Sequence, residues 1–195
     1  MNFADIYRFA NAIERRNIPF RALSDQIVAH HPHVGEVALY PCKLDETISL
    51  GHIVYDQDRS SPYDGTFDVA IICFSQTLNR CWRRLVCTKE LMHVFDGTQG
   101  RTSSRDRFVT LLRELETAPR YEDASPMFKT ERDALWKSLL VLCPERLYAK
   151  HIRRDLTGNE IAAVADTLKI PVQAVRALMS PYYHVARENL TGEVP

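Results

Sequence analysis

An almost unbroken apolar run, FDVAIICFS at residues 67–75, is the feature that most constrains the fold of this chain. Because the middle of the run is apolar at every position, it predicts a central strand covered on both faces of a sheet. Two shorter runs rich in β-branched and aromatic residues precede it, EVALYP at 36–41 and LGHIVYD at 50–56, with turn-forming residues between them. The pattern therefore predicts a small sheet, and we expect it to be mostly antiparallel.

Helical spacing of apolar residues governs the rest of the chain. Two helices are expected before the sheet, at about 2–13 and 19–31, and a long helix is expected directly after it, at 77–96. Further helical segments follow at 105–116, 129–143 and 145–154, and two short helices follow within 156–183. We therefore expect an α+β fold in which the small sheet packs on the 77–96 helix. Residues 1–143 would form this domain, and residues 144–195 a helical C-terminal subdomain packed on it.

Composition limits the classes of partner and the compartment. Lys+Arg and Asp+Glu both number 25, so no overall field attracts the chain to nucleic acid or to an acidic membrane surface. No apolar run approaches the roughly 20 residues that span a bilayer, and the charged N-terminus does not resemble a signal peptide. The five cysteines form no CxxC pair, which favours free thiols in a reducing compartment. A cytoplasmic protein without membrane partners is expected.

The segment CTKELMHVFD at residues 87–96 carries Lys89, Glu90 and His93 on a helix that is apolar in most directions. A helix of this kind is normally buried. Lysine and glutamate are rarely buried unless they are paired. We therefore expect these side chains to enter enclosed space and to find charged partners there.

The order of elements around this motif resembles the ImmA/IrrE family of zincin-like metallopeptidases. The resemblance spans residues 35–180 and rests on a strand, a connection rich in Arg and aromatic residues, and then RRLVCTKELMHVFD. That family carries HExxH, in which two histidines one turn apart bind zinc and the glutamate is the general base. The family's third ligand, usually a glutamate, comes from a following helix. TERDALWKSLLVLCPERL has that form, and the resemblance implies that Glu131 occupies the ligand position.

One residue departs from the family motif, because Lys89 stands where the first zinc-binding histidine is expected. An ammonium group has three donors and no acceptor, so it cannot bind a metal. His93 and Glu131 alone leave the site one ligand short of the three that catalytic zinc needs. A lysine there would supply positive charge between Glu90 and Glu131. We therefore expect Lys89 to replace the metal, with no cofactor bound.

The resulting hypothesis is a pseudoenzyme that has lost peptidase activity and acts as a regulatory or protein-binding domain. The resemblance implies a helix-turn-helix repressor as its protein partner. An active metallopeptidase that cleaves a repressor-like protein is the alternative, with Glu90 as base and zinc held by His93, Glu131 and a substitute ligand, Asp96. Glu90-x-x-His93 also resembles half of a carboxylate di-iron motif, but the chain has no second ExxH. In a purely structural alternative Glu90 is exposed and His93 packs in a core.

The C-terminal region has features of a helix-turn-helix unit. Thr157 and Glu160 have the spacing of a capping box, and KIP makes the turn, with Lys169 in place of the usual glycine. On the second helix Gln173 and Arg176 could reach base edges.

A DNA-binding or scaffold function is therefore a third hypothesis. It needs several phosphate contacts in addition to base contacts. The preceding helix offers a basic stripe at i, i+4, i+7 and i+8, formed by Arg146, Lys150, Arg153 and Arg154. A solvated face beside a packed helical hairpin explains the same pattern without nucleic acid.

Overall fold

The structure is a computed structural model that describes residues 1–47, 49–57, 68–96 and 126–192. The helix expected at 105–116 lies outside these described residues. Elements before the sheet are α1 (Phe3–Ala12) and α2 (Phe20–His30). The sheet contains β1 (Val34–Cys42), β2 (Gly51–Gln57) and β3 (Asp68–Ser75). After it come α3 (Arg80–Met92), the 3-10 turn η1 (His93–Phe95), α5 (Pro126–Leu142), α6 (Glu145–His151), α7 (Gly158–Leu168), α8 (Val172–Met179) and α9 (Tyr182–Thr191).

The sheet has the strand order β1-β3-β2, so β3 is the central strand, as predicted. β2 pairs with β3 antiparallel, whereas β1 pairs with β3 parallel, with Ala38 opposite Ile71. The prediction of a mostly antiparallel sheet is therefore wrong, and the sheet is mixed. The reason is topological. β3 lies between the two earlier strands, and these run in opposite directions, so β3 is antiparallel to β2 and parallel to β1.

The two faces of β3 differ in burial. Ala70 and Ile72 are fully buried and Phe74 is nearly so, whereas the alternate residues Ile71 and Cys73 are only half-buried. The prediction that both faces of this strand are covered therefore holds for one face only. Helix α3 contacts both β3 and β2. A Cβ atom at Gly51 would lie only 2.6 Å from Val86 Cγ1, so glycine is needed there for the helix to approach β2.

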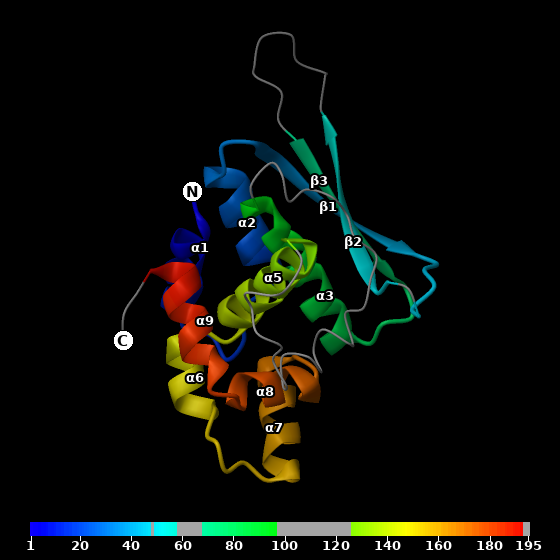
Figure 1. Cartoon of the computed structure of the whole chain (residues 1–195). Coiled ribbons are helices and arrows are strands. Elements are labelled where there is room, and N and C mark those ends of the chain that lie inside the picture. The colour runs from blue at the N-terminus through cyan, green and yellow to red at the C-terminus, as the bar shows by residue number, and fades with distance from the viewer. Residues whose placement is uncertain (48, 58–67, 97–125, 193–195) are drawn as a thin grey trace.

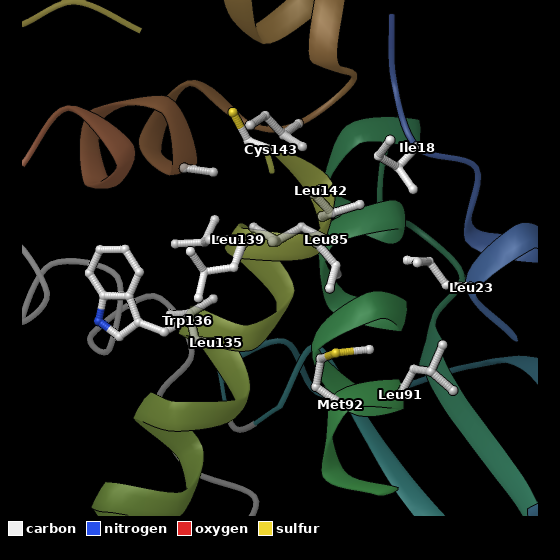
Figure 2. Packing of buried hydrophobic residues seen from close by; sticks show 14 of the residues in the cluster. Ile18, Leu23, Leu85, Leu91, Met92, Leu135, Trp136, Leu139, Leu142 and Cys143 are labelled. Carbon is white, nitrogen blue, oxygen red and sulfur yellow. The ribbon is translucent and has the colours of Figure 1, made fainter. Parts of the chain in front are cut away.

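Helices α3 and α5 form the centre of the molecule, with the sheet at one end and the C-terminal helices at the other (Figure 1). Asn79 caps α3, because its side chain accepts hydrogen bonds from the backbone N–H groups of Cys81 and Trp82. Figure 2 shows Leu85, Leu139 and Leu142 gathered between α3 and α5, and all three are buried. This packing holds α3 against α5, so side chains on the facing turns of the two helices can meet.

The C-terminal helices join the same hydrophobic core as the N-terminal elements. The Tyr183 hydroxyl of α9 donates a hydrogen bond to the Cys143 carbonyl at 3.2 Å, and the rings of Tyr148 and Tyr183 stack with centroids 3.7 Å apart. Within the described part of the chain, no helix is long and apolar enough to cross a membrane.

The predicted capping box of α7 is confirmed, since Thr157 and Glu160 exchange side-chain to backbone hydrogen bonds. The helix ends at Lys169, which has φ 54° and ψ 47°, the left-handed conformation that glycine adopts most easily. The Arg84 guanidinium donates to the carbonyl of Lys169 at 3.1 Å and also to those of Leu168 and Ile18. Arg84 thus ties α3 to the end of α7 and to the segment before α2.

Candidate functional site

The KExxH segment forms the last turn of α3 and the following 3-10 turn, and its polar side chains are buried. The exposed fractions are 4% for Lys89, 3% for Glu90 and 8% for His93. Leu91 and Met92 are fully buried beside them, because the helix is enclosed on most sides. Burial of these charges requires compensation by partners, since an unpaired ion in a protein interior is costly.

Lys89 has two carboxylate partners. Its Nζ lies 3.0 Å from Glu90 Oε1, and it forms a second ion pair with the carboxylate of Glu131 on α5. Burial acts to lower the pKa of Lys89, but the two carboxylates raise it above its ordinary value. Lys89 is therefore charged in the folded protein.

His93 lies between the carboxylates of three neighbours. Its Nδ1 is 2.6 Å from Asp96 Oδ2, while its Nε2 is 3.5 Å from Glu131 Oε1 and 3.9 Å from Glu90 Oε2. An ionised carboxylate only accepts hydrogen bonds, so Nδ1–H donates to Asp96. This bond fixes the orientation of the ring and turns Nε2 towards the two glutamates. Metal-binding histidines are commonly oriented by a carboxylate in the same way.

Lys137 completes the group, and sequence reasoning missed it. Its Nζ lies 2.8 Å from Asp96 Oδ1, so both oxygens of that carboxylate are engaged. Lys137 is only 8% exposed and comes from α5, as Glu131 does. A signal was present, since this lysine interrupts the otherwise apolar run ALWKSLLVLC. We call these six buried or largely buried side chains the Lys89 cluster: Lys89, Glu90, His93, Asp96, Glu131 and Lys137.

The structure thus brings together all five residues that the sequence suggested for a metal or catalytic centre. Among the described residues, no group of three or more His, Cys, Asp or Glu side chains is arranged to hold a metal ion. The ion pairs explain why these side chains are not arranged around a metal ion. Lys89 holds the carboxylates of Glu90 and Glu131, and Asp96 lies at Nδ1 of His93, on the opposite side of the ring from Nε2.

The prediction of a basic stripe along one helix is wrong for its last two residues, Arg153 and Arg154. Helix α6 ends at His151, and Ile152 leaves it in an extended conformation with its side chain buried. Arg153 therefore lies beyond the helix, where it forms an ion pair with Glu160 at 2.8 Å, and Arg154 follows it. The buried position of Ile152 redirects the chain, a tertiary effect that helical spacing does not reveal.

Arg146, the first residue of that expected stripe, forms hydrogen bonds within the protein. Its guanidinium donates to the backbone carbonyls of Asn11 at 3.4 Å and Arg15 at 3.0 Å, and also to that of Ile13. These carbonyls lie at the end of α1 and just after it, so Arg146 joins α6 to this region. The two candidate base-reading residues, Gln173 and Arg176, are exposed on α8.

The pH dependence of stability should report the ion pairs of Asp96. Burial acts to raise the pKa of Asp96, but the His93 hydrogen bond and the Lys137 charge together lower it below its ordinary value. Its stabilising effect is therefore present above the ordinary carboxyl pKa and is lost as the pH falls through the lowered value. We expect Asp96→Asn to lose about 1–3 kcal/mol at pH 7.

Thermal denaturation of both proteins between neutral pH and about pH 2 checks this prediction. The stability curves of the wild type and Asp96→Asn should separate at neutral pH and converge only at acidic pH, as the pH falls below about 4 and through the lowered pKa of the wild-type carboxylate. Curves that stay parallel over this range would contradict a contribution from the charge of Asp96.

Comparisons of the chain with models of protein families, with curated proteins and with solved structures found no match.

Proposed function

We propose that this chain is a zincin-like protein of ImmA/IrrE type that has lost peptidase activity and acts as a regulatory, protein-binding domain. One observation carries the proposal. The ammonium group of Lys89 is buried between two carboxylates, Glu90 and Glu131, one helical turn from His93. This is the place at which the first ligand of a zincin motif would stand.

The arrangement of His93 supports a former metal site over an incidental polar core. Its Nδ1 is held by Asp96 at 2.6 Å, so its Nε2 is turned to within 3.5 Å of Glu131 Oε1. A histidine and a glutamate from two helices therefore converge on one point, with the histidine oriented as a ligand would be. The positive charge at that point is the Lys89 ammonium, which offsets the repulsion between the two glutamates.

The same contacts argue against hydrolysis. In a zincin the glutamate of the motif accepts a proton from a metal-bound water. Here Glu90 Oε1 lies 3.0 Å from the Lys89 ammonium, so the base is engaged in an ion pair. Asp96, the substitute ligand of the active alternative, has both oxygens engaged by His93 and Lys137. Neither group is available for catalysis without rearrangement of the Lys89 cluster.

The partner of such a domain would be a protein, and the family resemblance suggests a repressor of the helix-turn-helix type. If the chain no longer catalyses hydrolysis, binding of this partner should not depend on the Glu90 carboxylate. Glu90→Gln should leave partner binding intact, because Glu90 is buried and its carboxylate performs no reaction. In an active peptidase the same substitution would abolish cleavage of the partner.

Restoring the histidine of the motif should restore the metal site. We expect Lys89→His to bind about one equivalent of zinc, because the introduced imidazole would join His93 and Glu131 as the third protein ligand. Zinc at 100-fold above its dissociation constant should then raise the free energy of unfolding by about 2.7 kcal/mol. Metal analysis of protein purified without a histidine tag, and urea denaturation with and without zinc, measure both effects.

The matched control is Lys89→His combined with His93→Ala, which should lose the gained zinc. Wild-type protein should contain clearly less than one equivalent of zinc or iron. If wild-type protein instead carries one equivalent of zinc that disappears in His93→Ala, the loss of activity proposed for this chain is refuted and the active alternative is favoured.

A further inference from the structure

A basic cavity is lined by residues that do not belong to the Lys89 cluster. Its volume is about 380 Å³, and it is bordered by the segment after α1, by α6 and by the last turn of α7. Its charged and titratable lining residues are Glu14, Arg15, Arg16, Arg146, Lys150 and His151. Four permanent cations thus face a single carboxylate. This local excess contrasts with the overall chain, in which positive and negative residues balance at 25 each.

The cations of the cavity differ in how firmly they are held. Arg146 is half-buried, and its Nε and Nη2 groups donate to backbone carbonyls, including that of Arg15 at 3.0 Å. Arg16 and Lys150 are exposed and can turn towards a bound anion. His151 is half-buried at the same wall, and its pKa is lowered by burial and by the charges of Lys150 and Arg146. The direction of this shift is consistent with a positive potential in the cavity.

We propose that this cavity binds a small anion that carries two or more linked phosphate groups. Guanidinium and ammonium groups are the side chains that proteins use most for phosphate, and arginine does so with two parallel hydrogen bonds. A volume of about 380 Å³ lies at the lower end of the range for small-molecule sites. Four cations in that space exceed what one monophosphate can neutralise, so a linked phosphate chain matches the charge better.

The lining also limits what part of a ligand is recognised. No Phe, Tyr or Trp side chain is among the described residues that line the cavity, so the half-buried His151 ring is the one aromatic group there on which a nucleobase could stack. A nucleotide would therefore be held mainly by its phosphates. Double-stranded nucleic acid fits less well, because its phosphates follow an extended surface whereas these cations line a single hollow. Arg153 and Arg154, which could have extended the surface, do not line the cavity.

Calorimetric titration tests the proposal with four probes: tripolyphosphate, pyrophosphate, ATP and inorganic phosphate. At about 150 mM salt, where exposed charges are screened beyond about 8 Å, tripolyphosphate and pyrophosphate should bind more tightly than phosphate. ATP should bind about as tightly as tripolyphosphate does, since it is held mainly by its phosphates. Arg16→Ala and Lys150→Ala should each weaken tripolyphosphate binding about tenfold, the effect of one lost charge-assisted contact.

Two further variants distinguish anion binding in this cavity from a general attraction of anions by surface charge. Arg154→Ala removes a neighbouring cation outside the cavity and should leave the affinity within about twofold of wild type, as expected for a screened charge. Glu14→Gln removes the carboxylate that faces the cations and should tighten binding. The proposal is overturned if the four probes bind equally, if duplex DNA binds while tripolyphosphate does not, or if Arg16→Ala and Lys150→Ala leave the affinity unchanged.

Discussion

Replacing Lys89 by methionine is expected to lower the free energy of unfolding by about 3–5 kcal/mol, the cost of breaking a buried ion pair from one side. Methionine has nearly the length of lysine, so packing changes little and the charge is what disappears. The carboxylates of Glu90 and Glu131 would then face each other without the ammonium that separates them. Lys89 is only 4% exposed, so solvent cannot replace the lost partner.

A second substitution shows whether the loss comes from the ion pair. Glu131→Gln in the Lys89→Met background removes one of the two stranded charges, so the double variant should be less destabilised than the sum of the single variants. Urea denaturation at neutral pH measures all three proteins. The exposed lysine Lys43 provides the control, since Lys43→Met should change stability by less than about 0.5 kcal/mol. A Lys89→Met protein as stable as this control would remove the physical basis of the proposed function.

The site was predictable from sequence to the extent that it depends on one helix. An apolar helix with Lys89 and Glu90 on it implies that both are buried and paired, and the helical form of residues 129–143 offered Glu131 as a partner. The contact itself depends on how α3 and α5 lie against each other, which the resemblance to a known family suggested and local pattern did not. Lys137 shows what the sequence does not reveal. A lysine in an apolar run implies a buried partner, but not which carboxylate provides it.

The fold was predictable in its elements and less so in its connections. Short runs rich in β-branched and aromatic residues locate β1, β2 and β3, and the apolar run of β3 correctly places it in the centre of the sheet. The direction of β1 relative to β3 depends on the insertion of β3 between two earlier strands that run in opposite directions, and local pattern carries no signal for either. The end of α6 at His151 has a similar origin, because burial of Ile152 outweighs the helical spacing around it.

Arg84 is a residue whose importance only the tertiary structure reveals, and Arg84→Met is expected to cost about 3 kcal/mol. The substitution would leave the carbonyls of Ile18, Leu168 and Lys169 without this donor, and a buried acceptor left unpaired costs about 1–3 kcal/mol. Burial lowers the pKa of Arg84 to about 10, so the guanidinium remains charged at neutral pH. The loss therefore includes charge-assisted hydrogen bonds, which are stronger than neutral ones.

Arg84→Lys separates the charge of this residue from its geometry. Lysine keeps the positive charge but cannot present the planar fork that reaches carbonyls from two separate segments, so it should recover only part of the lost stability. Arg80→Met, an exposed change on the same helix, should alter the free energy of unfolding by less than about 0.5 kcal/mol. Urea denaturation ranks the three variants. If Arg84→Met and Arg80→Met proved equally mild, the guanidinium would not be what joins α3 to the end of α7, and the Lys169 turn would have to be held by the packing of α7 against α8 instead.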